Sequence, residues 1–299
     1  MEDKKRLIII DSNSLLHRAF HALPPLTTKS GEQTGAIYGF LLILFKAIKD
    51  LQANYIVACF DTKTPTFRHE KFKEYKAHRS KTPNEILLQL PKIKEVLEKL
   101  KIPFFAKEGF EADDLIATIA TTAKNQSDNL DIYILSGDLD NLQLVDKITK
   151  VYTLGKGIKD TVVYDEDKII SRFGVKPLQM IDFKALSGDS ADNISGVPGI
   201  GKKTAAELIQ KFDSIKNLYS EISQGMANIK PRIKDLLTLH KTTAFLSLEL
   251  VEMKKDVDIE FLLSNCEFGK FDLKEVEKKL IDFDFNTLIN RLPLLLNHK

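Results

Sequence analysis

The sequence predicts an α/β fold, in which a mostly parallel central sheet is flanked by helices and followed by a helical subdomain. Three short segments, residues 7–11, 56–61 and 132–138, are rich in apolar and β-branched residues and end on an acidic residue. Continuously apolar runs of this length are typical of buried parallel strands. Segments with helical periodicity alternate with the strands, which favours parallel pairing with helices on both faces of the sheet.

The elements follow in chain order from the hydrophobic pattern. Strands are expected at residues 6–11, 55–61, 102–105 and 131–136, and a strand pair at 149–154 and 161–164. Helices are expected at 34–51, 84–100 and 111–124. From about Glu166 onward the strand signal stops, and the sequence is typical of short helices joined by polar turns. We therefore expect an α/β core in residues 1–165 and a helical subdomain in residues 166–299.

Composition excludes several classes of protein. The 299 residues are 43% hydrophobic and 29% charged, which is typical of a globular chain. The longest apolar stretch, residues 40–45, is too short to cross a bilayer, and the N-terminus lacks the apolar core of a signal peptide. Cys59 and Cys266 lie too far apart in the sequence to indicate a zinc motif or a disulfide framework. We expect a cytoplasmic protein that does not contact membranes.

Positive charge is concentrated in one segment although the net charge is only +2. Between Lys63 and Lys81 there are seven lysine or arginine residues and two acids, with Phe67, Phe72 and Tyr75 interleaved. Such a segment is suited to binding a polyanion. A solvated charged surface is the alternative interpretation.

Acidic residues follow the predicted strands and begin the helix after residue 110. The carboxyl ends of parallel strands meet at one edge of a sheet, so these side chains are expected to form one acidic pocket. Clustered carboxylates repel one another, and divalent cations relieve that repulsion. The candidate ligands are Asp11, Asp61, Glu111, Asp113, Asp114, Asp138, Asp140, Asp189 and Asp192.

Each acidic group also has a simpler interpretation. Acids at 111–114 are favoured at a helix N-terminus, and those at 138–140 and 189–192 are common in turns. A calcium loop starting at Asp138 is excluded because Leu142 occupies a ligand position. Together, however, the nine acids without histidine or cysteine favour two or more Mg²⁺ or Mn²⁺ ions. Two ions about 3.5–4 Å apart can activate a water and stabilise a leaving oxygen.

A glycine-rich loop at residues 196–204 resembles a nucleotide-binding loop but fails its pattern. Lys203 stands where a P-loop needs serine or threonine, and Thr204 replaces the third glycine of a dinucleotide fingerprint. A helix–hairpin–helix at about 186–212 fits better. Gly199 and Gly201 allow a tight turn before the next helix, whose N-terminus binds phosphate, and Lys202 and Lys203 add positive charge. An ordinary helix–helix turn is the alternative.

Five sets of residues together resemble a known family, and they occur in its order between about residues 6 and 290. The runs are Asp11 to Phe20; Phe67 to Glu70 with Glu74 to Lys76; Gly109 to Asp114; Ser136 to Asp140; and Gly188 to Thr204. They resemble the 5′ nuclease domain of bacterial DNA polymerase I, which also occurs as a free-standing 5′–3′ exonuclease or flap endonuclease. We expect this chain to be a stand-alone protein. Departures at Ser12, Leu139 and Ser195 remove no proposed ligand.

The resemblance implies a PIN-like core with a helical arch at 62–95 above the acids and a helix–hairpin–helix beside them. It implies that eight of the nine acids are metal-site residues and that Asp114 accompanies them. Lys76 and Arg79 match basic residues near the scissile phosphate and are three apart, as on one helical face. Arg68 is expected to contact phosphate, and Tyr75 to stack on a base. Gly199, Gly201, Lys202, Lys203 and Thr204 are expected to bind DNA.

The expected function is a structure-selective, metal-dependent 5′ nuclease of replication and repair that acts as a monomer. Its substrates would be branched or nicked DNA with a 5′ single strand, with an RNA–DNA hybrid as a further one. The resemblance also allows K⁺ at the hairpin. The alternatives are a non-catalytic DNA-binding relative and a PIN-type ribonuclease.

Overall fold

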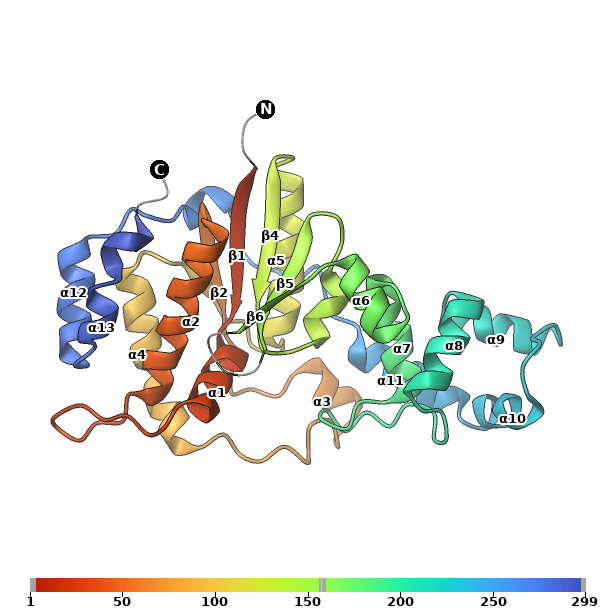
Figure 1. Cartoon of the computed structure of the whole chain (residues 1–299). Coiled ribbons are helices and arrows are strands. Elements are labelled where there is room, and N and C mark those ends of the chain that lie inside the picture. Colours follow the sequence, from red (N-terminus) through yellow and green to blue (C-terminus); the bar gives the residue numbers. More distant parts are fainter. Residues whose placement is uncertain (1–3, 156, 158–159, 297–299) are drawn as a thin grey trace.

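A six-stranded sheet forms the centre of the computed structural model, which describes residues 4–155, 157 and 160–296. The strand order is β3-β2-β1-β4-β5-β6. All neighbours pair in parallel except β5 and β6, which are antiparallel. The strands are β1 (Lys5–Asp11), β2 (Tyr55–Cys59), β3 (Phe104–Phe105), β4 (Leu130–Leu135), β5 (Thr149–Leu154) and β6 (Thr161–Tyr164). This confirms the predicted mostly parallel sheet (Figure 1).

Helices cover both faces of the sheet, because alternate residues of each strand point to opposite sides. Ile8 and Ile10 of β1 pack with one group of helices, and Leu7 and Ile9 pack with the other; all four are fully buried. The first group includes α1 (Ser12–Ala22), α2 (Gly35–Leu51) and α4 (Asn84–Lys99). The second includes α5 (Ala112–Gln126). The central strand is therefore apolar throughout because it is buried on both faces.

Helix α1 is absent from the predicted elements. Its N-cap is Asp11, whose Oδ1 accepts a hydrogen bond of 3.1 Å from the backbone N–H of Ser14. The first turn is Ser-Asn-Ser, which is a weak helix former, so the helix depends on this cap and on its buried face of Leu15, Leu16 and Ala19. The strand-terminal carboxylate thus also starts the next helix.

The segment at residues 62–83 crosses the carboxyl edge of the sheet, below the strands in Figure 1. It contains one short helix, α3 (Phe67–Lys71), and residues 73–78 form turns. The arch is therefore less helical than expected. Lys76 has a left-handed φ of 57°, so it does not share a helical face with Arg79, and that prediction is wrong.

Short helices follow the sheet, as predicted. They are α6 (Glu166–Phe173), α7 (Met180–Ser187), α8 (Lys202–Phe212), α9 (Ile215–Ser223), α10 (Pro231–Leu239) and α11 (Lys241–Val251), with the 3₁₀ turn η2 (Pro177–Gln179); the turn η1 (Asp140–Leu144) lies earlier, between β4 and β5. Helices α7 and α8 flank the predicted hairpin. A Cβ on Gly196 would lie 2.3 Å from the backbone nitrogen of Gly188, so only glycine permits this close approach.

The C-terminal segment returns to the sheet layer. It comprises η3 (Leu263–Cys266), α12 (Leu273–Asp282), α13 (Asn286–Ile289) and η4 (Leu292–Leu295). Val276 and Leu280 of α12 are fully buried against the cluster that contains α4 and α2. These residues thus pack on the α/β core rather than with α8–α10 (Figure 1). Among the described residues, no helix has the length and apolar character needed to span a bilayer.

Candidate active site

Acids from three strands and one helix meet at the carboxyl edge of the sheet. Asp11 ends β1, Asp61 lies just beyond β2, Asp138 follows β4, and Asp113 lies in the first turn of α5. The backbone N–H of Ala112 donates to Asp61 Oδ1 at 2.8 Å, which joins the end of β2 to the start of α5. The parallel sheet brings these distant residues together, as the strand pattern predicts.

Two neutral side chains hold this group of acids in place. The Ser136 hydroxyl donates to Asp11 Oδ2 at 2.6 Å and accepts from the backbone N–H of Asp138 at 2.9 Å. The Nδ2 of Asn141 donates to Asp113 Oδ1 at 3.0 Å. Ser136 and Asn141 are both fully buried. A buried hydroxyl and amide that orient carboxylates are typical of supporting residues around a metal site.

Burial and the charges of neighbouring acids raise the pKa values of Asp11 and Asp113. Burial, opposed by the Ser136 hydrogen bond and reinforced by Asp61 and Asp138, raises the pKa of Asp11 to about 7. Burial and the charges of Asp11, Asp138 and Asp140 raise the pKa of Asp113 well above its usual range. Such carboxyls are costly to ionise together without a cation.

A second acidic group surrounds Lys184 of α7. The Lys184 Nζ lies 2.7 Å from Asp189 Oδ2 and also forms an ion pair with Asp140. Burial, together with Asp138, raises the pKa of Asp140 to about 7 even though Lys184 opposes it. At Asp189, Lys184 outweighs burial and lowers the pKa. These residues line a cleft of about 700 Å³ that also reaches Lys202 at the start of α8.

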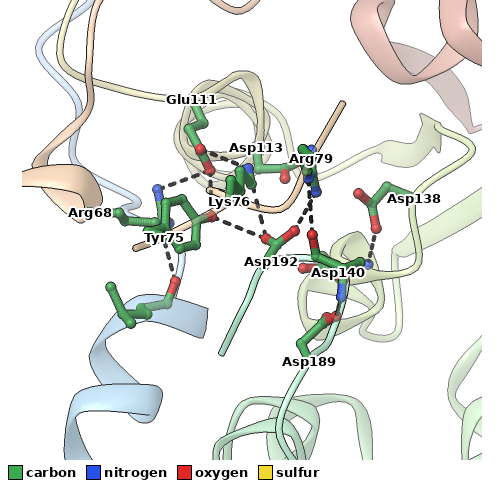
Figure 2. Close-up of polar contacts among 12 residues, drawn as sticks. Arg68, Tyr75, Lys76, Arg79, Glu111, Asp113, Asp138, Asp140, Asp189 and Asp192 are labelled. Carbon is green, nitrogen blue, oxygen red and sulfur yellow. Dashed lines mark hydrogen bonds and ion pairs between the residues drawn. The ribbon is translucent and has the colours of Figure 1, made fainter. Parts of the chain in front are cut away.

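The arch supplies two cations to a third group of acids (Figure 2). Lys76 Nζ lies 2.7 Å from Glu111 Oε1 and 3.8 Å from Asp192 Oδ2. Arg79 forms an ion pair with Asp192. Burial alone would raise the pKa of Glu111, but Lys76 and Arg68 lower it. The arch and the acids are therefore in direct contact.

The donor set fits hard divalent cations. It consists of carboxylates that burial and repulsion leave difficult to ionise, supported by a hydroxyl and an amide. In the part of the chain that the structure describes, no three acidic, histidine or cysteine side chains enclose a single point. Lys76, Arg79 and Lys184 instead pair with Glu111 and with the acids of the 138–140 and 189–192 turns. When metal ions bind, these carboxylates would therefore exchange their ammonium or guanidinium partners for the ions.

Three predicted site residues have surroundings that differ from those expected. Arg68, expected to contact phosphate, is 2% exposed, and its guanidinium forms a bidentate pair with Asp114 at 2.7 and 2.9 Å. Asp114, expected among the metal ligands, also accepts from the backbone N–H of Lys254 at 2.8 Å. Both groups are fully engaged in the interior, so neither is available to a phosphate or an ion in this structure.

Tyr75 is likewise buried, at 3% exposure. Its hydroxyl oxygen lies 3.1 Å from both Glu111 Oε2 and Asp192 Oδ2, and these two carboxylates share its one proton. Its ring packs with Ile194, Leu250 and their neighbours. In this arrangement the ring does not present a free face for base stacking.

The predicted hairpin residues lie at the N-terminus of α8, next to α10. Gly199 has a φ of 88°, which favours glycine, and a Cβ there would lie 3.0 Å from Leu236. Gly201 caps α8, and Lys202 and Lys203 are exposed in its first turn, followed by Thr204. The first N–H groups of a helix have no partner within it, so they are available to an anion.

The sequence pattern missed three residues that support the acids. Ser136 lies within a motif run without an assigned role, and Asn141 and Lys184 are not among the candidates. A signal existed for Lys184, since it lies five residues before Asp189 in a helix that leads into the acidic turn. Local sequence gave no signal for Asn141, because its partner lies on α5.

Comparisons with known proteins identify the family. Residues 6–174 match the family model for the 5′–3′ exonuclease N-terminal resolvase-like domain, and residues 175–274 match the model for the 5′–3′ exonuclease C-terminal SAM fold. DNA polymerase I of Bacillus subtilis (strain 168) is 40% identical over 98% of this chain. The chain spans 33% of that relative's length.

Solved structures share the fold. The T5 D15 protein co-crystallised with metal ions is 22% identical, with a TM-score of 0.68 over 93% of this chain and 98% of that one. The catalytic core of Rad2 in complex with DNA substrate is 21% identical, with a TM-score of 0.62 over 98% of this chain and 92% of that one. The matched family models cover nearly all of the sheet, the acids and the hairpin, and the chain belongs to the 5′–3′ exonuclease family.

Proposed function

We propose that the chain is a metal-dependent nuclease that hydrolyses phosphodiesters near the 5′ end of branched or nicked DNA. The observation that carries this proposal is the cleft of about 700 Å³, which joins Asp138, Asp140 and Asp189 to Lys202 of the hairpin. One continuous surface thus offers a cation site and a phosphate site. A backbone that contacts Lys202 and Lys203 would extend along the cleft toward the acids.

The ions would be Mg²⁺ or Mn²⁺, two or more in number. Asp11, Asp113 and Asp138, held by Ser136 and Asn141, would hold one, and the acids of the 138–140 and 189–192 turns would contribute to a second. When bound, the ions would activate a water and offset charge on the leaving oxygen. The metal ions crystallised with the T5 D15 protein, which shares this fold, support a metal site in this chain.

Lys76 and Arg79 would supply positive charge to the scissile phosphate. Both side chains already lie over the acids, and both pair with carboxylates that metal ions would engage. An incoming phosphate would then replace the carboxylates as their partner. Fixed cations aimed at a transferring phosphate stabilise the charge of its transition state.

Selectivity would depend on DNA shape rather than sequence. The exposed hairpin lysines and the amides at the start of α8 are suited to backbone phosphates, which carry no base identity. The Rad2 structure with DNA substrate supports DNA as the substrate class. The proposed substrates are DNA with a 5′ flap or a nick and RNA–DNA hybrids. The proposal also includes a K⁺ ion at the hairpin, a monomeric state and a cytoplasmic location.

A labelled 5′-flap duplex tests the proposal directly. We expect cleavage near the junction with Mg²⁺, none with EDTA, and none by Asp138→Asn with Mg²⁺, while this variant still binds the flap. The same duplex without a flap and the single strand alone should be poorer substrates. Binding without cleavage under all metal conditions would instead support a non-catalytic DNA-binding protein.

A further inference from the structure

Two hydrogen bonds attach the backbone of the turn at residues 73–78 to the acidic 189–194 loop. The backbone N–H of Lys76 donates to the Asp192 carbonyl at 3.0 Å. The Asn193 Nδ2 donates to the Glu74 carbonyl at 2.8 Å. The two hydrogen bonds lie on either side of Tyr75, so they fix the turn that carries Lys76. Neither bond involves a charged side chain.

Both sides of this contact have unusual backbone conformations. Lys76 and Asn193 each have a φ of 57°, in the left-handed region that most side chains disfavour. Asparagine tolerates this region better than lysine. The Lys76 conformation therefore requires support from its surroundings, and the hydrogen bonds to Asp192 and from Asn193 supply it.

The 189–194 loop is itself well defined. Asp189 and Ile194 pair as an isolated antiparallel bridge, with both hydrogen bonds at 2.8 Å. Asp189 Oδ1 also accepts from the backbone N–H of Ala191 at 2.9 Å. Ile194 is 5% exposed and packs against the Tyr75 ring. Asn193 thus projects from a rigid loop toward the arch.

We propose that Asn193 is a positioning residue that holds Lys76 over the acids, a role that rests on the proposed function. The ion pairs of Lys76 with Glu111 and Asp192 involve the same charges that metal ions and phosphate would engage. The Asn193–Glu74 bond does not compete with those ligands. It therefore keeps the turn in place while the Lys76 ammonium exchanges a carboxylate for the scissile phosphate. Preorganisation of this kind lowers the barrier without adding a contact to the DNA.

Asn193→Gly is the decisive variant, because glycine accepts the φ of 57° and lacks the amide side chain, although it also adds backbone freedom. Lys101→Gly is its matched control, since Lys101 has a φ of 56° and lies in an exposed turn after α4. We expect Asn193→Gly to slow single-turnover flap cleavage by about 10- to 100-fold while the Kd for the flap changes by less than about threefold. Lys101→Gly should cleave at the wild-type rate.

Two further measurements separate positioning from a general structural effect. Amide hydrogen exchange of residues 72–79, without DNA or metal, should be about tenfold faster in Asn193→Gly and unchanged in Lys101→Gly. The double variant Asn193→Gly/Lys76→Ala should cleave no more slowly than Lys76→Ala, because Asn193 acts through Lys76. Wild-type cleavage or wild-type exchange in Asn193→Gly would overturn the proposal, as would losses that multiply in the double variant. A wild-type protein that cleaves no flap overturns the proposed function instead, and the exchange comparison still decides whether Asn193 holds the turn.

Discussion

The guanidinium of Arg68 forms a bidentate ion pair with the carboxylate of Asp114 in the interior of the protein. Its two hydrogen bonds measure 2.7 and 2.9 Å, and Asp114 is fully buried. The Arg68 Nε also donates to the Leu250 carbonyl at 2.8 Å, and Nη2 donates to the Glu252 carbonyl at 3.0 Å. One side chain thus connects α3 at the base of the arch, α5 and the end of α11.

Arg68→Ala should strongly reduce stability, because it leaves the Asp114 carboxylate buried without its cation. Breaking a buried pair costs about 3–5 kcal/mol. Urea unfolding followed by circular dichroism measures this loss. Lys71→Ala is the matched control, because Lys71 pairs with Glu249 at the surface and should lose about 1 kcal/mol or less. A loss of similar size in both variants would contradict the structural role of Arg68.

Lys76→Ala should reduce the rate of cleavage far more than the affinity for DNA. Lys76 contacts Glu111 and Asp192 rather than the hairpin, so its charge acts at the acids and not at the duplex site. Loss of one fixed cation at a reacting phosphate costs about 10²-fold or more in rate. Single-turnover kinetics and flap titration in Ca²⁺ separate the two effects. Lys81→Ala, an exposed lysine of the same segment, should leave the rate within about twofold of wild type.

The strands and the meeting of their acids could be predicted from sequence because both follow from local patterns. An apolar run ending on aspartate identifies a buried strand and the sheet edge at which its carboxylate lies, as at Asp11 and Asp138. The hairpin could also be predicted from a local pattern, because a glycine just before a helix favours the left-handed φ that Gly199 adopts.

The partners of individual charges could not be predicted. Arg68 and Lys76 belong to one basic segment, yet Arg68 is buried against Asp114, 46 residues away, and Lys76 covers Glu111. Local charge counts do not distinguish a buried cation from an exposed one. The stacking role that the resemblance implies for Tyr75 also takes no account of tertiary packing, and contact with Ile194 decides the position of the ring.

Asp11→Asn should raise stability at neutral pH in the absence of metal. The folded pKa of Asp11 is about 7, whereas an unfolded aspartate has a pKa of about 4. The folded state therefore binds the proton more tightly, and stability falls as pH rises from about 4 to 7. At about 1.4 kcal/mol per pKa unit, the penalty above pH 7 is on the order of 4 kcal/mol at most. Asparagine removes the titration, its Oδ1 can still accept from the backbone N–H of Ser14, and its Nδ2 can donate to the Ser136 hydroxyl in place of the lost acceptor.

Thermal melts in EDTA between pH 5 and pH 8 test this effect. The melting temperature of Asp11→Asn should exceed that of wild type most at pH 8, and the difference should shrink toward pH 5. Asp258→Asn, at an exposed aspartate, provides the control and should show no such trend. A variant less stable than wild type at pH 8 would mean that Asp11 does not carry this penalty.

Lys184→Met should make the protein more dependent on divalent cations for its stability. Lys184 neutralises Asp140 and Asp189, so its removal leaves two partly buried carboxylates without a cation. We expect a lower melting temperature in EDTA and a larger increase on adding Mg²⁺ than in wild type, because the ion replaces the ammonium. Lys124→Met, which breaks a surface pair with Asp146, should change neither the response to Mg²⁺ nor its midpoint. An equal increase in melting temperature with Mg²⁺ in wild type and Lys184→Met would mean that Mg²⁺ does not replace the Lys184 ammonium.

Lys202→Ala/Lys203→Ala should weaken DNA binding without slowing cleavage of bound DNA. Both lysines are exposed in the first turn of α8, where they and the free amides face an incoming phosphate. Each lost phosphate contact removes about 0.9 from the slope of log K against log salt concentration, so the double variant should lose up to about 2. Kd values measured from 50 to 300 mM salt give that slope, and single-turnover rates at saturating DNA give the rate constant of the cleavage step. Lys274→Ala/Lys278→Ala removes the same charge from the exposed face of α12 and should leave the slope unchanged. A slope that changes equally in both double variants would indicate that net charge, rather than the hairpin, attracts the DNA.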